Sequence, residues 1–77
     1  MVPTLDEFRA FDSTGVRKWL ETYKELKKYG KTIEREGVTG CLLLAASVDA
    51  MMAVLSLNRM EADFLKSEVS KIIGGKG

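Results

Sequence analysis

The side chains that carry out most enzyme chemistry are sparse in this sequence. It contains no histidine, so the commonest general base and metal ligand is missing. Its one cysteine, Cys41, has no histidine partner and lies in the apolar run 41–46, which favours a buried, inert thiol. Asp49, Glu61 and Asp63 lack the spacing of a calcium loop. We therefore expect no enzymatic activity, no catalytic residue, no metal site and no cofactor.

The charged residues are balanced overall but unevenly distributed. The formal net charge is +1, so there is no global basic excess of the kind that drives nucleic-acid or membrane binding. Residues 17–35 are mainly basic, whereas residues 49–63 are mainly acidic. Two interpretations stay open: both segments are solvated helix faces, or the basic half of one copy meets the acidic half of another.

Helices are the elements that would position these side chains. The chain has 77 residues, of which 45% are hydrophobic, with one proline and no strictly alternating apolar segment, which predicts a single all-α domain. One apolar face with helical spacing predicts a helix from about residue 14 to residue 21 or 23; it comprises Val16, Trp19, Leu20 and Tyr23. We expect Trp19 to fill the centre of the core.

Further helices are predicted over residues 26–35, 40–44, 48–55 and 59–73, and a short N-terminal turn is anchored by Leu5, Phe8 and Phe11. Gly30 marks a bend or a close contact, and Gly37 is placed for a left-handed helix end. Capping side chains are expected at five helix starts: Thr4 with Glu7, the segment Asp12-Ser13-Thr14, Thr39, Ser47, and Asn58 with Glu61.

Two adjacent methionines lie in the fourth of these helices. Because neighbouring side chains on a helix point about 100° apart, at most one of them faces fully inward. The spacing of Met52 with Val48 and Leu55 predicts that Met52 packs in the core and that Met51 is exposed. Met60, at the start of the last helix, is the better candidate for an interface anchor.

Residues 11–73 resemble the sterile alpha motif (SAM) domain family. The segments that carry the resemblance are Val16-x-x-Trp19-Leu20, Leu26-x-x-Tyr29-x-x-x-Ile33, and Glu36-Gly37-Val38-Thr39-Gly40-x-x-Leu43-Leu44. The chain departs from the family at Leu55-Ser56-Leu57, where Leu-Gly-Ile is usual, and at Glu61-Ala62-Asp63, where a glycine and a basic residue are frequent. The resemblance implies a small five-helix bundle with a long C-terminal helix, preceded by an extension (1–10) and followed by a tail (74–77).

The resemblance also implies a function in protein–protein interaction. SAM domains associate with copies of themselves or with other SAM domains, which would make this chain an oligomerisation module of a larger scaffold or signalling protein. Two surfaces would take part. The mid-loop surface comprises Lys27, Lys28, Lys31, Glu34, Arg35 and Glu36, and the end-helix surface comprises Leu57, Asn58, Arg59, Met60, Glu61 and Asp63.

The polarity of these two surfaces is partly inverted relative to the family. We expect Glu61 and Asp63 of one copy to face Lys31 or Arg35 of another, a heterologous contact that builds open polymers or rings. The alternative is a module that binds RNA or anionic lipid through the face bearing Lys24, Lys27, Lys28 and Lys31. The acidic start of the last helix argues against RNA, and Tyr29 is expected in the core.

The cellular location is predicted from three absences. A single cysteine permits no internal disulfide, which favours a reducing compartment. No apolar run approaches the roughly 20 residues of a membrane span, and the N-terminus lacks the pattern of a signal peptide. These features predict an intracellular, cytoplasmic protein.

Overall fold

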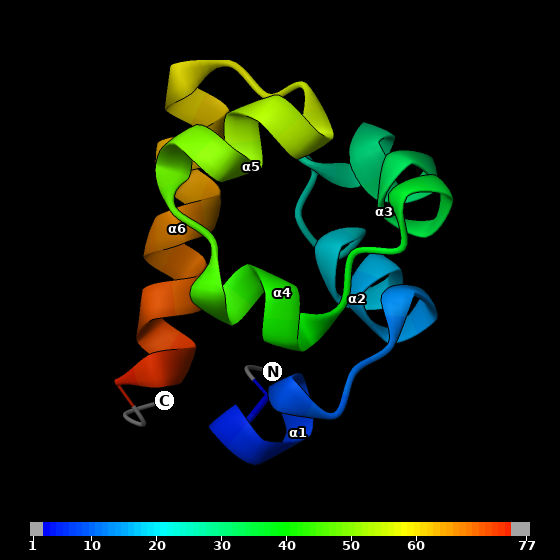
Figure 1. Ribbon diagram of the computed structural model, residues 1–77, viewed down its shortest axis with the longest axis vertical. Coiled ribbons are helices and arrows are strands. Elements are labelled where there is room, and N and C mark those ends of the chain that lie inside the picture. Colours follow the sequence, from blue (N-terminus) through cyan, green and yellow to red (C-terminus); the bar gives the residue numbers. More distant parts are fainter. Residues whose placement is uncertain (1–2, 75–77) are drawn as a thin grey trace.

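The computed structural model describes residues 3–74, and in this part of the chain helices are joined by turns and short loops, without a strand (Figure 1). Its elements are α1 (Leu5–Arg9), α2 (Ser13–Leu20), the 3₁₀ turn η1 (Lys27–Tyr29), α3 (Gly30–Glu36), α4 (Gly40–Ala45), α5 (Val48–Leu55) and α6 (Arg59–Ile73). The predicted all-α class and the long C-terminal helix are confirmed. The five predicted helices correspond to α2–α6, and α1 is an additional one.

Side-chain caps define where the helices begin. Asp12, Thr39 and Ser47 each accept a hydrogen bond from a backbone N–H in the first turn of the helix that follows. Thr4 with Glu7 and Asn58 with Glu61 form reciprocal capping boxes at α1 and α6, as predicted. Because each cap contributes roughly 1 kcal/mol, these polar residues account for much of the accuracy of the predicted boundaries.

The helices enclose one apolar core. α2 packs against α3, α5 against α6, and α1 against α4 and the C-terminal half of the bundle. In Figure 1, α6 runs along one side, with α5 across its N-terminal end and α1 near its C-terminal end. The buried side chains are Phe8, Val16, Trp19, Leu20, Leu26, Ile33, Val38, Leu43, Met51, Leu55, Leu57, Ala62, Leu65, Val69 and Ile72. None of the buried side chains in residues 3–74 is polar.

The N-terminal segment, set apart above as an extension, contributes to this core. Phe8 on α1 is completely buried and meets Trp19 edge-on, with ring centroids 4.9 Å apart. Trp19 is buried, as predicted, and its ring in turn lies 5.3 Å from that of Tyr23, which lies 5.6 Å from that of Phe64. Aromatic edge-to-face contacts therefore connect α1, α2 and α6.

The helix predicted over residues 26–35 is divided in two. It starts as η1 and becomes α-helical only at Gly30. Leu26 and Tyr29 both turn towards the core, and their separation of three residues equals one turn of a 3₁₀ helix. Gly30 is buried, and a Cβ atom at this position would lie 2.6 Å from a carboxylate oxygen of Glu21. The predicted close contact at Gly30 is confirmed.

The prediction for the two methionines is wrong. Met51 is buried together with Leu55, whereas Met52 and Val48 are only partly buried at the edge of the core. Met51 and Leu55 are four residues apart and share one face of α5, so Leu55 faces inward as predicted, but the inward face includes Met51 in place of Met52. α5 is apolar on nearly every side, and the packing of its neighbours decides which side faces inward.

The apolar run 41–46 is likewise less buried than predicted. Leu43 is its one buried side chain, whereas Cys41 and Leu42 are exposed. α4 has only six residues, and its N-terminus is held against α1 by the bond from the Gly40 N–H to the Phe11 carbonyl. The side of α4 that bears Cys41 and Leu42 therefore faces outward, and the prediction of a buried Cys41 thiol is wrong.

We expect Gly40→Ala to destabilise the fold far more than Gly37→Ala. A Cβ atom at Gly40 would overlap the Phe8 carbonyl oxygen, so α1 and α4 would have to separate, at a cost of about 3 kcal/mol or more. Gly37 has a φ of 67° but open space around it, and its replacement costs only about 1 kcal/mol. Urea unfolding of both variants measures the difference, and equal losses would contradict the close approach.

Candidate interaction surfaces

An apolar groove lies between α4 and α5. Its volume is about 360 Å³, and it is lined by Val38, Leu42, Leu43, Ala45, Ala46, Ala50, Met51, Val54 and Leu55. Leu42 is 46% exposed and Val54 is 38% exposed. Neither was among the predicted site residues, although α4 has no charged residue and α5 has only Asp49. Two successive helices that are apolar on nearly all sides cannot both be covered in so small a domain. This pattern in the sequence could have predicted the exposed groove.

The residues predicted to form the end-helix surface divide into two groups. Met60 is 80% exposed in the first turn of α6, between Arg59 and Asp63, whose charged groups lie 3.6 Å apart. Leu57 is buried in the core, and Asn58 caps α6. Met60, Arg59 and Asp63 are therefore the exposed members of this surface whose side chains have no capping role, whereas the exposed Asn58 side chain is engaged as the cap.

Glu61 is occupied within its own fold. Its Oε1 accepts hydrogen bonds from the Tyr29 hydroxyl (2.6 Å) and from the Asn58 N–H (3.1 Å), and its Oε2 lies 3.7 Å from Lys28 Nζ. The Glu61 side chain is only 16% exposed. Residues of the two predicted surfaces thus meet inside one molecule, and a contact between copies through Glu61 would have to displace these partners.

The Tyr29–Glu61 hydrogen bond alters the acidity of both groups. It is the main reason that the pKa of Glu61 is lowered, with a further contribution from the Asn58 backbone N–H. The same bond is the main reason that the pKa of Tyr29 is raised. Tyr29 was expected in the core, but it is only half-buried and packs against the edge of the core.

The residues predicted to form the mid-loop surface are also divided. Glu34 is held by Arg17 and Thr14 of α2, and Arg35 lies 3.4 Å from Glu36 at the exposed end of α3. The lysines instead line a polar hollow of about 570 Å³, which is formed by Arg17, Glu21, Lys24, Lys27, Lys28 and Lys31. We call this the lysine hollow. The structure therefore does not bring the six predicted residues together into one patch.

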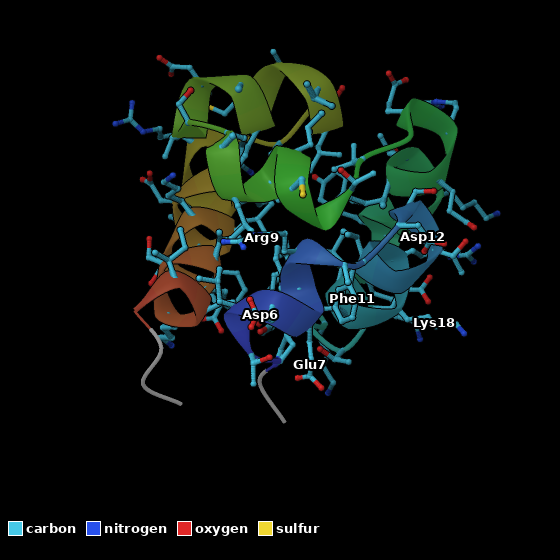
Figure 2. The ribbon with its side chains drawn as sticks, turned by 60° about the horizontal axis from the view of Figure 1, so that its bottom comes forward. Asp6, Glu7, Arg9, Phe11, Asp12 and Lys18 are labelled. Carbon is cyan, nitrogen blue, oxygen red and sulfur yellow. The ribbon has the colours of Figure 1, made fainter. Side chains whose placement is uncertain are left out.

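A third depression lies beside α1. It is lined by Pro3, Glu7, Ala10, Phe11, Gly15, Lys18, Trp19 and Thr22. Three of these residues, Glu7, Phe11 and Lys18, are labelled in Figure 2. The acidic groups here serve the helix ends: Glu7 accepts from the Thr4 N–H, and Asp12 accepts from the Gly15 N–H. Lys18, the other charged residue that lines this depression, does not cap a helix.

The described residues contain no cluster of three potential metal-ligating side chains of the His, Cys, Asp or Glu type. Cys41 is exposed, and its Sγ donates to the Arg9 carbonyl at 3.3 Å. Among the described helices, none is both long enough and apolar enough to span a bilayer.

Comparison with known proteins adds no relative. No family model, no curated protein and no solved structure matches this chain. The domain is therefore a small all-helical bundle whose relation to the SAM family stays a prediction.

We expect Tyr29→Phe to destabilise the domain by about 1 kcal/mol near neutral pH, because it removes a hydrogen bond to a charged carboxylate. The folded-state pKa of Glu61 is lowered, so its contribution to stability is present above the unfolded value of about 4.3 and is lost as the pH falls through the folded value. The penalty should therefore shrink in acid. Urea unfolding at neutral and acidic pH tests this, and a penalty independent of pH would contradict it.

Proposed function

We propose that this domain is a protein–protein interaction module that associates head to tail with a second copy of itself. The observation that carries the proposal is a pair of unpartnered apolar features. One is the α4–α5 groove with Leu42 and Val54 on its rim, and the other is Met60 on α6. Exposed apolar patches rimmed by polar residues mark interaction sites, and the flexible methionine side chain adapts to irregular pockets.

Charged residues of both signs flank each of the two features in the sequence. Arg35 and Glu36 come shortly before Val38, which lines the groove, and Asp49 directly precedes Ala50, which also lines it. Met60 is flanked by Arg59 and Asp63. In this proposal, insertion of Met60 into a neighbouring groove exchanges the internal Arg59–Asp63 and Arg35–Glu36 pairs for pairs of Asp63 with Arg35 and of Arg59 with Asp49. This retains the predicted pairing of Asp63 with Arg35, whereas Glu61 is left to its role within the fold.

The proposed contact joins two different surfaces, so it is heterologous. Such contacts form rings when the rotation closes and open chains when it does not. In this proposal the domain clusters copies of a larger intracellular protein, as the SAM resemblance implies. The proposal is supported by the agreement of α2–α6 with the helices expected from that resemblance.

We expect Val54→Glu and Met60→Glu each to abolish self-association, because each places a charge at one side of the apolar contact. A mixture of the two variants should form a one-to-one dimer and nothing larger, since each still carries one intact surface. Light scattering coupled to size-exclusion chromatography, over a concentration series, measures the mass. Assembly of the unmodified chain should also weaken at high salt, because rim charges are screened.

The matched control is Ile73→Glu, which alters a residue that is 47% exposed at the far end of α6. It should associate like the unmodified chain. A mixture of Val54→Glu and Met60→Glu that stays monomeric, or single variants that still assemble, would contradict head-to-tail pairing. An unmodified chain of constant mass near 8.5 kDa would contradict self-association itself.

A further inference from the structure

We propose that the lysine hollow binds a compact, multiply phosphorylated small molecule, an inositol polyphosphate either free or as a lipid headgroup. The hollow lies between α2, η1 and the start of α3 and is separate from the α4–α5 groove and from Met60. This proposal does not depend on self-association. It rests on the charges of the hollow, on their pairing, and on its size.

The hollow carries a local excess of positive charge. Five of its six lining side chains are cationic, and the sixth, Glu21, accepts a hydrogen bond from Arg17 Nε at 3.1 Å. Arg17 is also bonded to Glu34, and these two carboxylates raise its pKa, with the Glu21 hydrogen bond the largest cause. Lys28 lies 3.7 Å from Glu61. The carboxylates of Glu21, Glu34 and Glu61 are therefore already paired with cations.

Three lysines of the hollow have no such partner. Within residues 3–74, neither Lys24 nor Lys27 nor Lys31 is paired with a carboxylate; Glu25, exposed beside Lys24, makes no ion pair either. Cations elsewhere in this part of the chain are engaged: Arg9 with Asp6, Arg35 with Glu36, Arg59 with Asp63, Lys71 with Glu68, and Lys66 with the Ala46 carbonyl. Unpaired positive charge is thus concentrated at the hollow, with Lys18 the one exception outside it.

The local backbone keeps these lysines together. Lys27 and Lys28 belong to η1, and Lys31 follows in the first turn of α3, one helical turn after Lys27. Lysine ammonium groups are compact charges on flexible stems, so a site built from them favours charge density over a particular shape. A volume of about 570 Å³ suits a small molecule, because ligand pockets commonly measure about 300–1,000 Å³.

A nucleic acid fits the hollow less well than a small polyanion. Single-stranded RNA is read by stacking its bases on exposed aromatic rings, and the lining of the hollow includes none. The nearest ring, Tyr29, is half-buried, donates its hydroxyl hydrogen to Glu61, and has Lys28 Nζ 5.3 Å from its centroid. The lining also lacks an apolar side chain that would insert into a bilayer.

The test is calorimetric titration of the full chain with inositol hexakisphosphate at low salt. Lys27→Gln and Lys31→Gln should each weaken binding about fivefold, the usual contribution of one lysine near a dense anionic group. The matched control is Lys18→Gln, which removes the same charge from an exposed residue of α2 that lines the depression beside Phe11 (Figure 2). It should leave the affinity unchanged. Equal weakening by all three variants would overturn the proposal, because it would show attraction to net charge alone.

Further arms identify the source of the phosphates. Binding of the free polyphosphate without binding to phosphatidylcholine vesicles that contain phosphatidylinositol bisphosphate supports a soluble ligand. Binding of the chain to the free polyphosphate and to the vesicles, with each affinity weakened by Lys27→Gln, supports a lipid headgroup as the ligand. Absence of saturable binding to the free polyphosphate, or tighter binding to a single-stranded RNA oligonucleotide, would overturn the proposal. Repeating the titration with Met60→Glu, the variant expected not to self-associate, separates polyphosphate binding from self-association.

Discussion

The close approach of α4 to α1 is the constraint on which the rest of the fold depends. The chain at Gly40 runs against the Phe8 carbonyl, and the Gly40 N–H donates to the Phe11 carbonyl. Only a residue without a side chain allows this distance. The contact places Phe8 against Trp19 and closes the core beneath α4. It also turns Leu42 outward, so the same constraint that completes the core leaves the apolar groove open.

A second junction fixes the start of α6. Glu61 closes the capping box with Asn58 and accepts the Tyr29 hydroxyl, which ties the longest helix to η1. A similar contact lies further along α6, where Tyr23 donates to Glu68 at 3.0 Å. The pKa of Tyr23 is raised to about 12, mainly by burial of the hydroxyl and secondly by this hydrogen bond. Two tyrosines from the segment between α2 and α3 therefore hold α6 along its length.

The sequence predicted features that depend on neighbouring residues and missed those that depend on distant ones. Caps at Thr39, Ser47 and Asn58 act within a few residues, so α4, α5 and α6 begin where they were expected. The rotation of α5 depends on its packing against α6 and α3, and the prediction that Met52 is buried failed for that reason. The exposed Leu42 and the Tyr29–Glu61 contact likewise arise from packing between segments far apart in the chain.

Lys28 belongs to two sites at once, since it lines the lysine hollow and lies 3.7 Å from Glu61. This sharing links the two sites thermodynamically. A ligand that draws the Lys28 ammonium group into the hollow makes protonation of Glu61 easier, and protonation of Glu61 frees Lys28 for the ligand. Because linkage is reciprocal, both effects have the same free energy. Occupancy of the proposed ligand site in the hollow and the electrostatic part of the α6 anchor are thus linked through Lys28.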